Sequence, residues 1–518
     1  MFFKSAQEAF AQSDFNGAIE KFDKHSLIYP KDSSTQYWLG RCYDKLGNFD
    51  KSLEYYLKAV ELEPTNQEAL IWLARNYQRR KDTQKMMDVL GRLIRVNPKN
   101  VQAHYLAGYG YLGLKQPEQA ISEFTKVVEL EPKNLDSHYQ LGMLYEGAGK
   151  IEQAIKHYEK AIEIQPRFSK AYLRLGKIYL NRGDKDKVIQ FYSKGLQIEP
   201  GNPQEQYDLA TIYEERNEPT KAIEHFGLAN KFRPYKYDWH FQYARLLDQY
   251  TRTLDVEHAN GSEDFEKYAT MAVGEYTETI KLNYAYAPAF YYRGLFCRKY
   301  KQIGNTFYSY SQIAEDFKQA IKLDSKMLDA YYQLGLTYID MDGRSKAESI
   351  FKKALKINPN YKGINLQLGL IAEWREEYDD AIKYYKAEIK NDPKSAKAYQ
   401  ELGYLYSSYK MELNKAKKTL EKALELEPKN VLTLLNYGNT LYNMGETGSA
   451  IEKFELAVQI EPKNLTANYN LALVYERAGK RQLAIARWKK FLELNLPEQW
   501  RMDAKKHLEK LQKRVLKK

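Results

Sequence analysis

The sequence is poor in cysteine and histidine, and it contains no motif that carries enzyme chemistry. Two cysteines and eight histidines occur in 518 residues. A phosphate-binding loop, a dinucleotide-binding fingerprint, an HExxH metalloprotease motif and a nucleophile elbow are all missing. Carboxylates are numerous, but they lie on alternating charged faces and do not form isolated apolar pairs. We therefore expect a protein that is not an enzyme, has no catalytic residues and uses no cofactor.

Long hydrophobic runs are missing as well. No segment approaches the roughly 18 uninterrupted apolar residues of a membrane helix. The first residues, Met1 to Glu8, show no charged leader followed by an apolar core, so they do not read as a secretory signal. We expect a cytoplasmic protein, or a periplasmic or exported one if a leader has been removed.

What the sequence does have is proline at a fixed interval. In each of two series the prolines are 34 or 35 residues apart, and a gap separates the series: Pro30, Pro64, Pro98, Pro132, Pro166, Pro200 and Pro234, then Pro359, Pro393, Pro428 and Pro462. A period of this length is typical of stacked supersecondary units, each touching only its neighbours. Proteins of this kind bind along a surface.

The unit between two prolines has a recurring pattern of small and aromatic residues. One copy contains Leu141-Gly142, Tyr145, Gly149, Ala154, Tyr158, Ala161 and Pro166. This pattern resembles the tetratricopeptide repeat (TPR), whose signature is W-x2-L-G-x2-Y…A-x3-F…P. About 14 copies cover nearly the whole chain. The resemblance implies an all-α fold, a right-handed α-α superhelix (TPR solenoid), and we expect a C-terminal capping helix to close it.

The recurring spacing has a mechanical explanation in each unit. Glycine inside a helix costs about 1 kcal/mol relative to alanine, so close approach of the second helix must offset this cost at Gly40, Gly108, Gly142, Gly176, Gly294, Gly335, Gly369, Gly403 and Gly438. Aromatic residues of the second helix are expected to fill the core: Phe22, Tyr56, Phe124, Tyr158, Tyr192, Phe226, Phe351, Tyr385, Phe454 and Trp488. Asparagines two residues after the prolines are good N-caps for the next first helix: Asn66, Asn100, Asn134, Asn202, Asn430 and Asn464.

The period breaks in the middle of the chain, and this suggests a division into segments. We predict an N-terminal TPR array of about seven repeats in residues 1–234, irregular TPR units in 235–326, a C-terminal array of about five repeats in 327–497 and a basic capping helix in 498–518. The extra residues around Thr253–Asp264 are expected to form an extended loop between two helices, and a second insertion lies near 301–309. The basic end would also allow contact with nucleic acid or anionic lipid.

Neither the histidines nor the cysteines predict a site. His104 and His138 occupy equivalent positions in neighbouring repeats, but no spacing supplies the further ligands that zinc needs, and we expect no metal. Cys42 and Cys297 lie about seven repeats apart, too far to form a disulfide, and both read as small buried hydrophobic residues.

The candidate site is the groove that first helices line in a TPR superhelix. Residues on one side of each first helix would point into it: Tyr37, Arg41, Arg75, Arg79, Tyr105, Tyr109, Tyr139, Met143, Leu173, Tyr207, Phe241, Arg245, Tyr332, Leu336, Leu370, Trp374, Tyr404, Asn439, Tyr442 and Tyr469. The first stretch is basic, and the rest is apolar and aromatic. The lysine–asparagine clamp of chaperone-binding TPR modules is missing, because only Asn439 matches it and its lysine position holds Leu435.

These features favour a non-enzymatic scaffold that holds one or more proteins or peptides with apolar, aromatic and acidic segments. We expect no small-molecule substrate. One alternative is a substrate-recruiting or regulatory arm of an enzyme or of a secretion or assembly complex. Another is RNA binding by helical repeats, which the pI near 9 permits. The glycine, alanine and proline positions match the TPR, however, and the basic residues do not run continuously along the groove.

Overall fold

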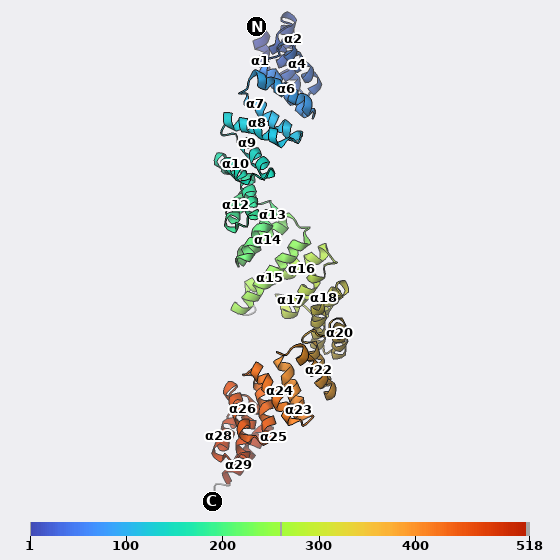
Figure 1. Cartoon of the computed structure of the whole chain (residues 1–518), viewed down its shortest axis with the longest axis vertical. Helices are drawn as coiled ribbons and strands as arrows, with labels where there is room; N and C mark the ends of the chain where they lie inside the picture. The colour runs from blue at the N-terminus through green and yellow to red at the C-terminus, as the bar shows by residue number, and fades with distance from the viewer. Residues whose placement is uncertain (1, 259–261, 514–518) are drawn as a thin grey trace. The chain divides into compact units, whose positions relative to one another are not determined.

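The structure is a computed structural model that describes residues 2–258 and 262–513 (Figure 1). Its helices follow one another as antiparallel pairs, and the chain forms two compact units, Met1–Trp239 and His240–Lys518. This confirms the predicted all-α solenoid of stacked helix pairs. The finer division into four segments stays a prediction.

The first unit alternates first and second helices without interruption. Its first helices are α1 (Phe2–Ala11), α3 (Ser33–Lys45), α5 (Gln67–Arg79), α7 (Val101–Gly113), α9 (Leu135–Gly147), α11 (Ser169–Asn181) and α13 (Pro203–Glu215). Its second helices are α2 (Phe15–Ile28), α4 (Phe49–Leu62), α6 (Thr83–Val96), α8 (Pro117–Leu130), α10 (Ile151–Ile164), α12 (Lys185–Ile198) and α14 (Pro219–Phe232). Each second helix from α2 to α12 also packs on the first helix of the next pair.

The second unit continues the alternation after two longer helices. Helix α15 (Tyr237–His258) begins at the end of the first unit and pairs with α16 (Glu263–Leu282). The later first helices are α17 (Ala287–Lys299), α19 (Leu328–Asp340), α21 (Ile364–Trp374), α23 (Ala396–Ser408), α25 (Val431–Asn443) and α27 (Leu465–Arg477). Their partners are α18 (Tyr310–Leu323), α20 (Arg344–Ile357), α22 (Tyr378–Asn391), α24 (Leu413–Leu426), α26 (Thr447–Ile460) and α28 (Arg481–Leu492), and α29 (Glu498–Lys513) follows.

In most helix pairs an aromatic ring of the second helix packs against a glycine of the first. All ten second-helix aromatics named above are at most 1% exposed. A Cβ placed on Gly142 would lie 2.5 Å from Tyr158 Cε1, so no larger residue fits there without a shift. The close approach expected at the first-helix glycines is therefore confirmed, and a buried ring requires it at all of them except Gly403, which faces Leu420.

The predicted asparagine caps are confirmed at five of the six positions. The side chains of Asn66, Asn100, Asn134, Asn430 and Asn464 each accept a hydrogen bond from a backbone N–H three residues later. Asn202 occupies the N-cap position of α13, but its amide donates to the Glu199 carbonyl oxygen at 2.8 Å. Pro203, the next residue, starts the helix with its fixed φ angle.

The predicted loop around 253–264 is wrong for most of its length. Residues 253–258 belong to α15, and Ser262 caps α16 by accepting a hydrogen bond from the Phe265 backbone N–H at 3.1 Å. Residues 259–261 lie outside the described part. The helix continues because Leu254 lies one heptad after the buried Leu247 and is itself 7% exposed, so the added turns bury apolar surface.

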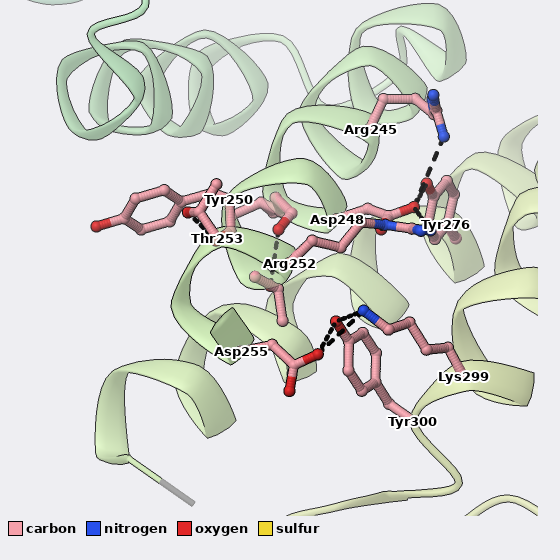
Figure 2. Close-up of polar contacts among 11 residues, drawn as sticks. Arg245, Asp248, Tyr250, Arg252, Thr253, Asp255, Tyr276, Lys299 and Tyr300 are labelled. Carbon is pink, nitrogen blue, oxygen red and sulfur yellow. Dashed lines mark hydrogen bonds and ion pairs between the residues drawn. The ribbon is translucent and has the colours of Figure 1, made fainter. Parts of the chain in front are cut away.

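Polar contacts hold the first part of this extension. Asp248 is 1% exposed and accepts hydrogen bonds from Arg252 Nε at 2.5 Å and from the Tyr276 hydroxyl of α16 at 3.3 Å (Figure 2). Arg245 also forms an ion pair with Asp248 at 3.6 Å. One buried carboxylate thus ties α15 to itself and to α16.

The end of the extension contacts the C-terminal end of α17. Asp255 accepts a hydrogen bond from the Tyr300 hydroxyl at 3.2 Å and pairs with Lys299 Nζ at 3.0 Å (Figure 2). Directly after Tyr300, strands β1 (Gln302–Ile303) and β2 (Thr306–Phe307) form a short antiparallel hairpin. The extended end of α15 is thus held by the end of α17, and the hairpin that follows Tyr300 contacts α16.

The predicted capping helix is confirmed as α29. Ala504 and Leu511 are buried in the same hydrophobic cluster as Trp488 and Phe491 of α28. The helix covers the apolar face that the last repeat would otherwise expose, which a solenoid end requires.

Candidate binding face of the first helices

The predicted groove residues all belong to first helices, and we call the side that helical spacing assigns to them on each of these helices the first-helix face. Tyr37 is 5% exposed, so it belongs to the core more than to the surface. Five positions are exposed: Arg79, Met143, Trp374, Tyr404 and Asn439. The rest are partly buried: Arg41, Arg75, Tyr105, Tyr109, Tyr139, Leu173, Tyr207, Phe241, Arg245, Tyr332, Leu336, Leu370, Tyr442 and Tyr469.

The basic stretch at the start of this face centres on a residue that the sequence reasoning missed. The guanidinium of Arg41 lies 3.8 Å from the ring centroid of Trp72, and that of Arg75 lies 4.8 Å from it. Arg79 forms an ion pair with Asp44 of the preceding first helix. Trp72 lies three residues before the predicted groove residue Arg75, and its size and planarity were the available signal.

Tyrosine side chains of α7 are fixed by α9. The hydroxyls of Tyr105 and Tyr109 both donate to Asp136 Oδ2, at 2.8 and 2.5 Å, and Gln140 Nε2 donates to the Tyr109 hydroxyl at 2.9 Å. Burial, followed by the bond to the Asp136 carboxylate, raises the pKa of both tyrosines. Both hydroxyls therefore stay protonated at neutral pH.

A surface hollow of about 730 Å³ lies beside this cluster. It is lined by Tyr105, Pro132, Lys133, Asn134 and Asp136, among others. The hollow lies where the loop before α9 passes α7, so it is open to a side chain from another molecule. Predicted residue Tyr105 forms part of its wall.

The remaining predicted aromatics of the first unit make contacts with the next repeat. Tyr139 packs edge-on against Phe168, with ring centroids 5.1 Å apart. Tyr207 stacks on Trp239 at 4.5 Å with an angle of 16° between the ring planes. Met143 keeps 37% of its surface exposed. These rings form the joints between repeats and expose only part of their area.

In the second unit the predicted residues divide into packed and exposed ones. Phe241 packs edge-on against Tyr286 at 5.0 Å. Arg245 lies over Tyr292 at 3.8 Å and pairs with Asp248, so its charge is matched within the chain. By contrast, Trp374 is 61% exposed and Tyr404 is 41% exposed.

Two further hollows lie along the C-terminal first helices. One of about 540 Å³ is lined by Leu435, Asn436 and Asn439 of α25 together with Thr466 of α27. Asn439 Oδ1 there accepts a hydrogen bond from Asn470 Nδ2 at 3.2 Å. The predicted residue Tyr442 accepts a hydrogen bond from an arginine of α27, Arg477.

The last hollow lies between α27 and the capping helix. Its volume is about 490 Å³, and Tyr469, Trp500, Met502, Asp503 and Lys506 contribute to its lining. The Tyr469 hydroxyl donates to Asp503 Oδ2 at 2.7 Å, and its ring lies 5.2 Å from the Trp500 ring. The capping helix thus adds its own side chains to the first-helix face.

The histidine pair considered as a metal site is not brought together. His104 Nδ1 lies 2.6 Å from Glu123 Oε2, whereas His138 Nδ1 lies 3.1 Å from His157 Nδ1. In the described part of the chain no three histidine, cysteine, aspartate or glutamate side chains are grouped so that they could hold a metal ion.

Both cysteines are buried, as expected, and neither forms a disulfide. Burial raises the pKa of the Cys42 and Cys297 thiols to about 12. The thiolate is the reactive form of cysteine, so both side chains are chemically inert at neutral pH.

Comparison with known families agrees with this architecture. Family models described as tetratricopeptide repeat or TPR repeat match residues 33–66, 68–100, 101–134, 135–168, 157–190, 328–361, 396–430, 419–452 and 438–479. The chain belongs to the tetratricopeptide repeat family. The matched segments 33–66, 101–134, 135–168, 328–361 and 396–430 each contain one complete helix pair, and matches occur in both compact units.

Relatives of this TPR protein match it only in part. Anaphase-promoting complex subunit 3 of Schizosaccharomyces pombe is 30% identical over 89 residues, 17% of this chain and 13% of the relative. BBSome complex member BBS4 of Bos taurus is 27% identical over 141 residues, 27% of each chain. The chain thus spans about a quarter or less of these relatives.

Solved structures superpose on this TPR protein with low TM-scores. The crystal structure of MamA is 26% identical, with a TM-score of 0.31, and the alignment covers 32% of this chain and 97% of that chain. The crystal structure of the APC/C hetero-tetramer Cut9-Hcn1 is 14% identical, with a TM-score of 0.36, and covers 92% and 96%. Within the described residues, no helix has the length and apolar composition needed to span a membrane.

Proposed function

We propose that this TPR protein is a non-enzymatic scaffold that binds partner polypeptides along its first-helix face. The observation that carries the proposal is that three surface hollows include predicted groove residues, Tyr105, Asn439 and Tyr469. First helices line the concave surface in this family, and hollows with apolar and polar walls are where partner side chains are held.

Binding would rest on burial of apolar partner side chains against the exposed aromatic residues. Trp374 and Tyr404 expose more of their surface than most aromatic residues of the chain. Large aromatic residues contribute most of the binding energy in many interfaces. The tyrosines that are fixed by carboxylates, such as Tyr105, would present rigid ring surfaces at little entropic cost.

The comparisons support a role within an assembly. One relative is named as a subunit of the anaphase-promoting complex and another as a member of the BBSome complex. Because the matches span small parts of those proteins, their partners are not transferred to this chain. We place the protein in the cytoplasm and expect no small-molecule substrate.

A mutational comparison of exposed residues tests this proposal. The partner is first captured from native extract and identified, and its affinity for the purified full chain is then measured by calorimetry. Replacing both Trp374 and Tyr404 with alanine is expected to weaken binding about tenfold or more. The Tyr105→Ala and Tyr139→Ala pair should act in the same direction, but both rings pack between repeats, so helicity must be checked by circular dichroism.

The matched control uses exposed apolar residues of second helices. Leu456 is 37% exposed on α26 and Leu483 is 49% exposed on α28. The Leu456→Ala and Leu483→Ala pair should leave the affinity unchanged. If both first-helix pairs bind as wild type, or if the control pair loses as much affinity, the first-helix face is not the binding surface.

A further inference from the structure

Two arginines at the start of the first-helix face share one indole ring. Arg41 comes from α3, whereas Arg75 and Trp72 come from α5. Their Cζ atoms lie 3.8 and 4.8 Å from the ring centroid of Trp72. These are the distances of guanidinium–aromatic contacts, so the indole holds two positive charges together.

Neither of these charges has a counter-ion within the described part of the chain. No carboxylate there lies within ion-pair distance of Arg41 or Arg75, whereas neighbouring Arg79 and Arg80 pair with Asp44 and Asp50. Arg41 Nη1 donates to the Tyr37 hydroxyl at 2.9 Å, which is a neutral acceptor. Like charges held close together favour the binding of an anion.

We propose that Arg41 and Arg75 form a binding site for the side-chain carboxylates of an acidic polypeptide segment. The inference rests on the proposed function and specifies the chemistry of the partner at one end of the first-helix face. A guanidinium stacked on a ring keeps its N–H edge available, and that edge matches a carboxylate with two parallel hydrogen bonds.

The surroundings of Arg41 strengthen such a contact. The rings of Phe10 and Trp38 lie 5.6 and 6.0 Å from its Cζ atom, in addition to the Trp72 ring. Apolar neighbours reduce the local dielectric response, so a charge pair formed here is stronger than one in open solvent. The aromatic rings also fix the guanidinium, which reduces the entropic cost of binding.

A polypeptide fits the arrangement better than a nucleic acid does. Proteins that bind single strands use aromatic faces open to a base, but the Trp72 ring already carries a guanidinium at stacking distance. They also need positive charge along the strand, and the two following repeats hold Tyr109 and Met143 at the positions of Arg41 and Arg75.

A defined peptide tests the site without knowledge of the natural partner. The probe is a fluorescently labelled peptide of alternating glutamate and alanine with acetylated and amidated ends, so that only side-chain carboxylates are present. Its glutamine–alanine counterpart is the neutral control. Fluorescence anisotropy with the full chain at low salt should show binding of the glutamate peptide about tenfold or more above that of the glutamine peptide, with a decrease at higher salt.

Matched variants assign this binding to the two arginines. The double variant Arg41→Gln and Arg75→Gln should bind the glutamate peptide only as weakly as wild type binds the glutamine peptide. The double variant Arg41→Lys and Arg75→Lys should retain an intermediate affinity, because lysine keeps the charge but cannot form the planar contact. The Arg92→Gln and Arg95→Gln pair on α6 removes the same charge and should stay within about twofold of wild type. Arg75→Gln alone serves if the double variant loses helicity.

Three results would overturn the inference. These are equal binding of the two peptides, an equal loss in the α6 control pair, or tighter binding of a polyuridine strand that depends on the same arginines. If the peptide test fails but the Trp374 and Tyr404 variants lose partner binding, the carboxylate site is ruled out and the proposed scaffold function is still supported.

Discussion

Gly335 lies so close to Phe351 that a Cβ on the glycine would be 2.2 Å from the phenylalanine Cε1 atom. The glycine is in α19 and the ring is in α20, so the contact sets the spacing of one helix pair. The same relationship recurs between Gly142 and Tyr158, and it explains why a residue that weakens helices recurs inside them.

Replacing Gly335 with alanine should therefore destabilise the second unit. The new methyl group forces the helices apart or moves the Phe351 ring, and overpacking of this kind costs about 1–3 kcal/mol. The midpoint of thermal unfolding, followed by circular dichroism, should fall. Gly274 is the control, because it lies inside α16 with nothing within 4 Å of its Cβ position. Gly274→Ala should raise the midpoint, because it should add about 0.5–1 kcal/mol to the free energy of unfolding.

Removing the Asp248 carboxylate should loosen the extended helix pair. Asp248→Ala would leave Arg252 and the Tyr276 hydroxyl without their buried acceptor, a loss of about 1–3 kcal/mol. Hydrogen exchange should accelerate in α15 and α16. Asp380 pairs with Lys383 at the surface, with its side chain 55% exposed, so Asp380→Ala should change little. Equal effects of the two variants would contradict the structural role given to Asp248.

Glu388 provides a third prediction because it caps a helix from outside. Its carboxylate oxygens accept hydrogen bonds from the backbone N–H groups of Gly363 at 2.6 Å and Leu366 at 3.2 Å, at the start of α21. Glu388→Ala leaves both partly buried donors without this acceptor and should cost about 1–3 kcal/mol. Glu388→Gln keeps one acceptor oxygen and should lie between the alanine variant and wild type in urea unfolding. An alanine variant as stable as wild type would mean that water replaces the cap.

Features that repeat could be predicted from the sequence, and features that occur once could not. The prolines, glycines and asparagine caps recur in register, so many copies of the unit support the same structural assignment, and this was enough to predict the fold. The prediction of a loop around Thr253 was wrong because it relied on the polar composition of the segment. The burial of one apolar residue, Leu254, extends the helix instead. No repeat pattern indicates that Glu388 reaches back to Gly363.

The candidate site shows the same limit at the level of single residues. Helical spacing placed Tyr37 in the groove, but the ring is 5% exposed because it packs between Trp38 and Tyr56. Trp72 was missed because helical spacing predicts only the side of the helix on which a residue lies. It does not show how far a large side chain extends towards neighbouring residues. Which arginines keep an unmatched charge depends on contacts between repeats, and these become visible only in three dimensions.

The His138–His157 pair predicts that acid weakens the first unit. Their Nδ1 atoms are 3.1 Å apart, so one must donate and the other must accept, and both rings cannot be protonated in this arrangement. Burial, followed by the charge of His138, lowers the pKa of His157 to about 4, and burial also lowers the pKa of His138. The unfolded chain binds protons near pH 6.5, before the folded chain does. Stability is therefore complete above about pH 6.5 and decreases as the pH falls towards about 4.

His157→Gln tests this linkage because it removes the titrating group and keeps a polar side chain next to His138. The drop in the thermal midpoint between pH 7 and pH 5 should be smaller in the variant than in wild type, whereas the midpoints at pH 7 should be similar. Two repeats further on, Gln206 stands at the position of His138 and faces His225, at the position of His157, with 2.6 Å between Oε1 and Nδ1. Such a glutamine–histidine pair is thus compatible with the fold. If wild type and variant lose the same number of degrees on acidification, the histidine pair is not the source of the pH dependence.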